Sequence, residues 1–238
     1  MRRVAFISDL HANLVALDAV LADIDALGVE EIVCLGDIVD LGAQPAELLE
    51  RLHERGIRCI RGNHDGLDEH PPLPKLLEIE RWTREQLSEA QLRELDELPS
   101  ELELDLDGLR VLCVHATPLN DTDQILDSTP RELLDEWFEG REFDVLVGGH
   151  THVQLVRRLD HRMIVNVGSA SMPFARPFVE GGGAPEVLPW AEYGILSGDG
   201  GRASVELRQV DFSMQAYAEA VRAAGFPNAD EWIASMSC

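Results

Sequence analysis

The apolar positions of the first sixty residues fall into short continuous runs. Val4 to Ile7, Ile32 to Leu35 and Ile57 to Ile60 are apolar or β-branched at almost every position, and a polar cluster follows each run. Strands that are covered on both faces have this pattern, because apolar residues then occupy both sides of the strand. The runs therefore predict buried strands that end in polar loops.

Stretches with a helical period separate these runs. Apolar residues recur every three or four positions from Leu14 to Leu27, where Asn13 can cap the start of a helix and Gly28 can end it. A second helix is expected from Pro45 to about Arg55, and a long acidic helix with a solvated face from about Lys75 to Asp96. A stiff loop is expected before the acidic helix, at Pro71, Pro72 and Pro74.

The remaining chain predicts further short strands. The expected strands are Glu101 to Leu106, Leu109 to Val114, Phe143 to Val147, Val153 to Leu159 and Met163 to Val167. The other expected elements are helices near 131–138 and 214–224, an aperiodic loop at 171–189 and a hairpin around 197–201. Because no repeat or linker interrupts this α/β pattern, we expect one domain over 1–238, with a motif core at 3–168 and a C-terminal hairpin and helices at 190–238.

The charge, the apolar runs and the cysteines of the chain restrict the classes of partner and metal site that are expected. Twenty Lys and Arg residues against 44 Asp and Glu give a formal charge of −24, which excludes a long nucleic acid because such binding needs a basic surface. No apolar run reaches the roughly 18 residues that span a bilayer, so we expect no membrane partner and a soluble, cytoplasmic protein. Three of the four cysteines (Cys34, Cys59 and Cys113) lie in strand-like runs, and the lack of a C-x-x-C pair excludes the usual thiolate zinc site.

Nine polar residues gather at the predicted carboxyl ends of strands. They are Asp9, His11, Asp37, Asn63, His64, Asp65, His115, His150 and His152. Each alone has an ordinary structural explanation, such as a helix cap, a turn or a hydrogen-bonded histidine. Ligands bind at the carboxyl ends of strands in α/β sheets, and nine such residues at five strand ends therefore predict a binding site.

The donor types indicate a metal. Carboxylate, amide and imidazole groups without sulfur suit Mn²⁺, which we favour, or Fe, Zn²⁺, Co²⁺ or Ni²⁺. The candidate ligands exceed the needs of one ion, whereas two divalent ions roughly 3.5 to 4 Å apart would use seven or eight and share a carboxylate. Such pairs clamp the attacking and leaving oxygens in phosphoryl transfer, so we expect hydrolysis at phosphorus.

The order of these motifs carries a resemblance to a known family. Asp9-Leu10-His11, Gly36-Asp37, Gly62-Asn63-His64-Asp65, His115 and Gly149-His150-Thr151-His152 occur in this order along the chain. The pattern resembles the calcineurin-like metallophosphoesterases, and within them the small bacterial and archaeal phosphodiesterase-like branch. The resemblance implies a four-layer αββα sandwich of two mixed β-sheets flanked by helices, with a dinuclear metal site at the strand carboxyl ends.

The resemblance also implies roles for single residues. Asp9, His11 and His152 would bind the first metal ion, Asn63, His115 and His150 the second, and Asp37 would bridge them. A hydroxide between the ions would attack phosphorus in line. His64 would protonate the leaving oxygen or neutralise phosphoryl charge, with Asp65 as its orienter. In the loop 171–189, Phe174 and Arg176 are candidates for gripping a base or aryl group and a phosphate, against the alternative of an ordinary surface loop.

Several functions stay open on the sequence alone. The partner would be a small phosphorylated substrate: a phosphodiester, a dinucleoside polyphosphate or a phosphomonoester. Phosphoproteins rank lower, because the stretch from Gly36 to Asp40 lacks the Arg-Gly that follows it in phosphoprotein phosphatases. A noncatalytic scaffold on the same fold is a different alternative. It is disfavoured because all seven ligand positions and His64 are filled by the expected residue types.

Overall fold

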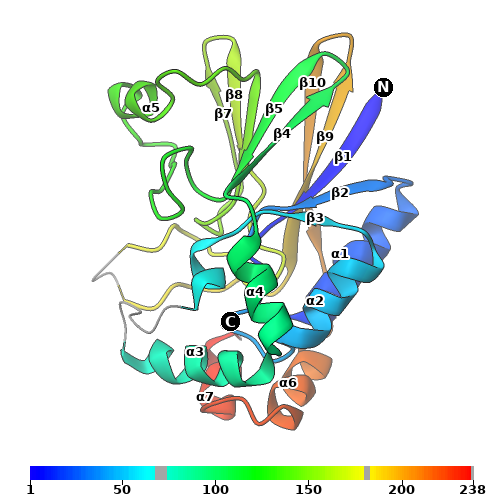
Figure 1. The fold of residues 1–238 in the computed structure, drawn as a ribbon, viewed down its shortest axis with the longest axis vertical. Helices are drawn as coiled ribbons and strands as arrows, with labels where there is room; N and C mark the ends of the chain where they lie inside the picture. Colours follow the sequence, from blue (N-terminus) through cyan, green and yellow to red (C-terminus); the bar gives the residue numbers. More distant parts are fainter. Residues whose placement is uncertain (68–73, 180–182, 237–238) are drawn as a thin grey trace.

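Two five-stranded sheets form the centre of the described chain (Figure 1). The computed structural model describes all residues except 68–73, 180–182 and 237–238. Sheet A has the order β10-β9-β1-β2-β3, and its strands are β1 (Arg2–Ile7), β2 (Glu31–Cys34), β3 (Arg58–Cys59), β9 (Ala191–Asp199) and β10 (Arg202–Val210). Sheet B has the order β4-β5-β6-β8-β7, and its strands are β4 (Glu101–Leu106), β5 (Leu109–Val114), β6 (Val145–Gly148), β7 (Leu155–Leu159) and β8 (Arg162–Asn166).

Both sheets are mixed. In sheet A, β1, β2 and β3 are parallel, with Ala5 opposite Ile32, whereas β9 runs antiparallel to both β1 and β10. In sheet B, β5, β6 and β8 are parallel, and the outer strands β4 and β7 are antiparallel to their neighbours. The parallel strands at the centre of each sheet direct their carboxyl ends to one edge, where the polar loops follow.

Helices cover the outer faces of the sheets, which gives the expected four layers. In Figure 1, α1 (Leu14–Ala26) and α2 (Pro45–Glu54) lie along sheet A, and α5 (Arg131–Trp137) lies beyond sheet B. The remaining helices are the 3₁₀ turn η1 (Asn63–Gly66), α3 (Pro74–Gln86), α4 (Glu89–Glu97), α6 (Met214–Ala223) and α7 (Ala229–Ser235). The predicted sandwich of two mixed sheets with flanking helices is confirmed.

The main core lies between the sheets. Val4, Phe6 and Val33 of sheet A pack with Val111 and Val145 of sheet B, and all five side chains are buried. A second cluster joins sheet A to α1 and α2, and a third joins sheet B to α5. The central strands are therefore buried on both faces, which explains their continuous apolar runs.

Most predicted elements occur, and the differences have local causes. Asn13 caps α1 through its side-chain oxygen, which accepts from Ala16 N at 3.0 Å. The prediction of a single acidic helix over 75–96 is wrong, because the chain forms two helices, α3 and α4, in this region. Ser88 starts the second helix through a reciprocal Ser88–Gln91 capping box. Pro74 starts α3 and is not part of a loop, while Pro71 and Pro72 lie outside the described residues.

Candidate metal centre

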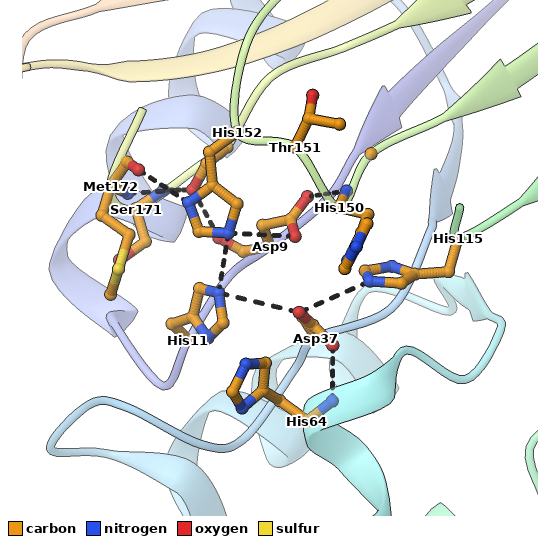
Figure 2. Close-up of polar contacts among 12 residues, drawn as sticks. Asp9, His11, Asp37, His64, His115, His150, Thr151, His152, Ser171 and Met172 are labelled. Atoms are coloured by element: carbon orange, nitrogen blue, oxygen red, sulfur yellow. Dashed lines mark hydrogen bonds and ion pairs between the residues drawn. The ribbon is translucent and has the colours of Figure 1, made fainter. Parts of the chain in front are cut away.

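The predicted ligands converge from both sheets (Figure 2). In chain order they are Asp9 and His11 after β1, Asp37 after β2, Asn63 after β3, His115 after β5, and His150 and His152 after β6. Sequence separations of up to about 140 residues thus close into one cluster. The residues meet because the central strands of both sheets end at this edge.

Two glycines allow the loops after β2 and β3 to touch. Gly36 has a φ of +96°, and a Cβ atom on it would collide with the backbone of Gly62. A Cβ atom on Gly62 would collide with the backbone nitrogen and carboxylate of Asp37. The close approach places the His64 backbone N–H 2.8 Å from Asp37 Oδ1, to which it donates. Glycine is therefore needed in both motifs for backbone contact.

Five of the seven predicted ligands have a left-handed backbone. They are Asp9, His11, Asp37, His150 and His152, with φ between 43° and 67°. Each such non-glycine residue costs on the order of 1 kcal/mol, and such conformations persist where the surrounding structure enforces them. This concentration of strained backbone coincides with the cluster of ligand side chains.

The first group of potential ligands consists of Asp9, His11, Asp37 and His152. One donor atom from each lies within 4.8 Å of the others, and all four residues are buried. His152 Nε2 lies 3.1 Å from His11 Nε2 and 3.2 Å from Asp9 Oδ1. His11 Nε2 lies 3.8 Å from Asp37 Oδ2. These atoms surround a space of the size that one metal ion occupies.

The second group consists of Asp37, His115 and His150, again within 4.8 Å. His115 Nε2 lies 3.4 Å from Asp37 Oδ2 and 3.0 Å from Asn63 Oδ1, which brings the predicted ligand Asn63 to the same place. Asp37 belongs to both groups. The structure therefore places the predicted bridging carboxylate between the two sets of histidines.

Backbone carbonyls orient all four histidines. Nδ1 of His11, His115 and His152 lies 3.1, 2.8 and 2.8 Å from the carbonyl oxygens of Asp40, Leu35 and Met172. His150 instead places Nε2 at 3.0 Å from the Thr122 carbonyl. Because a carbonyl only accepts, the contacting nitrogen carries the proton, and the other nitrogen of each ring faces the cluster. Metal-binding histidines in proteins are oriented in this way.

The donor atoms fit a metal cation. When the proton of each neutral ring is on Nδ1, the Nε2 atoms of His11 and His152 each carry a lone pair, and these two atoms lie 3.1 Å apart. Asp9 Oδ1 is buried beside them and accepts no hydrogen bond in the described chain. Three electron-pair donors in one buried space repel one another unless a cation lies between them. The residues present therefore suit a divalent ion.

Electrostatics favour the ligand forms of several groups. Burial lowers the pKa of His11 to about 3 and that of His150 to about 4, so both rings are neutral at pH 7. Burial opposes ionisation of Asp37, but His115 and other nearby histidines outweigh it and hold its pKa well below its usual range. Burial also disfavours a charged His115, yet the Asp37 carboxylate raises the pKa of that ring to about 10. Metal binding would therefore displace a proton from His115.

Known proteins share this pattern. The model of the calcineurin-like phosphoesterase superfamily domain matches residues 2–179. This chain belongs to that superfamily. It is 33% identical over 172 residues to the uncharacterized protein MJ0912 of Methanocaldococcus jannaschii, a match that covers 69% of this chain and 68% of the relative.

Two solved structures share the calcineurin-like fold over almost the full chain. A metallophosphoesterase from Sphaerobacter thermophilus has a TM-score of 0.75 and 28% identity, with 98% of each chain covered. Hypothetical protein PH1004 from Pyrococcus horikoshii OT3 has a TM-score of 0.81 and 23% identity, with 99% of this chain and 98% of that chain covered. Membership of the superfamily supports a hydrolase that binds divalent metals.

None of the described helices combines the length and apolar character that a membrane span needs.

His64 of this calcineurin-like domain lies beside the metal groups with a partner that sequence reasoning missed. Its Nδ1 lies 3.0 Å from Oδ2 of the fully buried Asp40, and Thr83 Oγ1 donates to Asp40 Oδ1 at 3.3 Å. Burial disfavours the charged ring, but Asp37 and Asp40 outweigh it and raise the pKa of His64 to about 9. The sequence feature that could have indicated this partner is Asp40 itself, a second aspartate three residues after Asp37.

The prediction that Asp65 orients His64 is wrong. The Asp65 carboxylate points to the backbone and accepts from the N–H groups of Asp37, Ile38 and Gly62 at 2.9, 2.7 and 2.8 Å. It therefore holds the loops after β2 and β3 together. Hydrogen bonds from backbone N–H groups favour the ionised carboxylate. Burial and the nearby Asp37 carboxylate outweigh them and raise the pKa of Asp65 to about 6.

The two candidates of the loop 171–189 differ in their surroundings. The Phe174 ring stacks on the His152 ring, with centroids 4.3 Å apart and an interplanar angle of 21°. Arg176 is exposed, and no hydrogen bond or ion pair joins its side chain to the described residues. The two proposals of substrate contact therefore rest on different grounds. Phe174 touches a potential metal ligand, whereas Arg176 is an exposed cation with no side-chain partner among the described residues.

Proposed function

We propose that the protein is a metal-dependent phosphoesterase that uses two divalent ions, with Mn²⁺ as the favoured metal. The observation that carries the proposal is Asp37, which the first and second groups share. A shared carboxylate between two sets of oriented histidines is the arrangement expected of a two-ion site. Superfamily membership supports the same chemistry.

The chain's own residues would divide the work at such a site. Asp9, His11 and His152 would hold one ion, Asn63, His115 and His150 the other, and Asp37 both. When bound, the ions supply positive charge that lowers the pKa of water and stabilises the phosphoryl oxygens. The carbonyls of Leu35, Asp40, Met172 and Thr122 keep the ligand rings oriented, so little reorganisation is needed on binding.

His64 is proposed as the proton donor to the leaving oxygen. Asp40 fixes its Nδ1, so Nε2 is free to face a substrate. Without metal ions, the carboxylates of Asp37 and Asp40 raise the pKa of His64 to about 9. Asp40 is not a proposed ligand, so its contact would still favour the protonated ring beside bound ions. A protonated imidazole held at one end by a buried carboxylate can deliver its proton from the other end.

The substrate is proposed to be small: a phosphodiester, a dinucleoside polyphosphate or a phosphomonoester. A formal charge of −24 opposes long polyanions at a distance, whereas the ions would attract a single phosphate group at contact. Arg176 is the cation proposed to hold a phosphate oxygen, because it is exposed and unpaired among the described residues.

A substrate panel on metal-stripped protein tests the proposal. Phosphomonoesters, diesters, cyclic nucleotides and dinucleoside polyphosphates are assayed after Mn²⁺, Fe²⁺, Zn²⁺, Co²⁺ or Ni²⁺ is restored singly. We expect hydrolysis of at least one small class with Mn²⁺, and a rate about 10² to 10⁴ lower with His64→Ala on esters of poorly acidic alcohols. Two bound ions without hydrolysis of any class would favour the noncatalytic scaffold.

A further inference from the structure

The segment 172–174 contacts His152 at three points. The Met172 carbonyl lies 2.8 Å from His152 Nδ1, and the Phe174 backbone N–H donates to the His152 carbonyl at 2.9 Å. The Phe174 ring then covers one face of the imidazole, with centroids 4.3 Å apart. The His11 ring also lies close, with centroids 5.0 Å apart and an Nε2–Nε2 distance of 3.1 Å. The imidazole therefore contacts Phe174 through a ring face and His11 through its Nε2 atom.

The backbone fixes the side-chain direction of His152 less than that of His115, so His152 depends more on contacts such as those of this segment. It lies in an irregular stretch after β6 and has a left-handed φ of 57°, so no strand or helix sets its side-chain direction. His115, in contrast, directly follows β5 and has no positive φ. A hydrogen bond to Met172 fixes one ring nitrogen but leaves rotation about that bond, which a stacked ring restrains.

The segment is itself tied to the metal centre. Ser169 Oγ donates to the Asp9 carbonyl at 2.8 Å and accepts from Met172 N at 2.9 Å. Downstream, Phe174 forms an isolated bridge with Val187, and Leu188 N donates to the Pro173 carbonyl at 2.8 Å. Phe174 is therefore held from both sides of the loop, and its ring has a fixed support from which to restrain His152.

We propose that Phe174 is a positioning residue that fixes His152 for the first ion and has no role toward the second. The inference rests on the metal centre of the proposed function, but not on the reaction. Partners that orient metal-binding histidines typically change metal affinity by 10- to 100-fold when removed. Because the Met172 carbonyl contact would remain, we expect the lower end of that range for the loss of the ring.

The test is calorimetric titration of the metal-stripped full chain with Mn²⁺. Phe174→Leu keeps an apolar side chain but removes the aromatic face, and we expect about tenfold weaker binding of one ion with the other unchanged. Phe174→Tyr keeps the ring and should restore the affinity. Phe178→Leu is the matched control, because Phe178 is an exposed aromatic residue of the same loop for which no ring contact is described. It should leave both affinities as they are.

A double-mutant cycle identifies the ion. The Phe174→Leu effect should vanish in a His152→Ala background and persist in a His115→Ala background, because only the first of these removes the ring that Phe174 restrains. Equal weakening of both ions, or an effect that survives in His152→Ala, would overturn the inference. Thermal unfolding with chelator checks that each variant folds. Two-ion binding without hydrolysis would defeat the proposed function alone and leave the positioning of His152 standing.

Discussion

Sheet A and sheet B contribute different chemistry to the same centre. The loops of sheet A supply the two proposed carboxylate ligands, Asp9 and Asp37, and the supporting carboxylates Asp40 and Asp65. The loops after β5 and β6 of sheet B supply only imidazoles to the two groups. Backbone N–H groups hold the carboxylates, as Asp65 shows, whereas backbone carbonyls hold the imidazoles.

Each sheet also orients ligands of the other. The His150 backbone N–H, from sheet B, donates to Asp9 Oδ2 at 3.0 Å. In the other direction, the Leu35 carbonyl, from sheet A, accepts from His115 at 2.8 Å. The carboxylates of the centre therefore come from the loops of one sheet, whereas the complete set of potential ligands needs both sheets of the sandwich. An ion bound by both halves would add stability to the sheet–sheet contact.

The largest effect is expected at the residue that serves both groups. Asp37→Asn removes an anionic ligand from each ion, so both should bind far more weakly than after loss of an outer partner, which typically costs 10- to 100-fold. Metal analysis of protein reconstituted with Mn²⁺ should fall from two ions per chain toward none. Retention of one tightly bound ion would show that Asp37 does not bridge.

The second effect separates chemistry from metal binding within sheet A. His64→Ala should lower kcat by about 10² to 10⁴ for esters of poorly acidic alcohols, the usual range for general acid catalysis. Activated aryl esters should lose less, because their leaving oxygen hardly needs a proton. Metal content should be unchanged. Loss of a metal ion in His64→Ala would show that His64 is a ligand. An equal fall in kcat for both ester types would show that His64 stabilises phosphoryl charge and is not the proton donor.

The third effect concerns the carboxylate that holds the loops of sheet A together. Asp65→Asn replaces an acceptor oxygen by an N–H donor that faces backbone N–H groups, and we expect about 2 kcal/mol less stability. Denaturant unfolding should show this loss with chelator and with Mn²⁺. Asp40→Asn is the matched comparison: it should lower kcat through His64 with a smaller loss of stability. Equal kinetic defects with no difference in stability would contradict the separate roles.

The smallest effect lies at a carboxylate away from the metal groups. Hydrogen bonds from Arg208 and Tyr193 lower the pKa of Asp23, so its ionised form stabilises the fold. Asp23→Asn should cost about 0.5 to 1 kcal/mol at pH 7, typical of a partly exposed pair. This contribution is present above the usual pKa of 3.8 and is lost as the pH falls through the lower folded-state value. The difference in the free energy of unfolding between the wild type and Asp23→Asn should therefore shrink below about pH 3.8, and chelator should not change it. Denaturant unfolding at several pH values measures it.

The sequence alone predicted which polar residues the structure brings together as potential metal ligands. Each potential ligand lies within a few residues after a predicted strand. The carboxyl ends of the central parallel strands lie at the same edge of the sandwich. Residues that follow these strands are therefore expected to lie close together in space. The cap at Asn13 is also a local feature, because it acts through backbone geometry within a few residues. Such features are readable because their physical cause lies within the segment itself.

The tertiary structure decided which neighbour each polar side chain chose. Asp40 and Asp65 are both aspartates in the loops after strands of sheet A, yet one contacts the His64 ring and the other the backbone of two loops. Phe174 meets His152 because the segment 172–174 runs beside the loop that follows β6, where the Phe174 backbone N–H donates to the His152 carbonyl at 2.9 Å. Side-chain direction and long-range loop contact select these partners, and neither is encoded in the spacing of the residues along the chain.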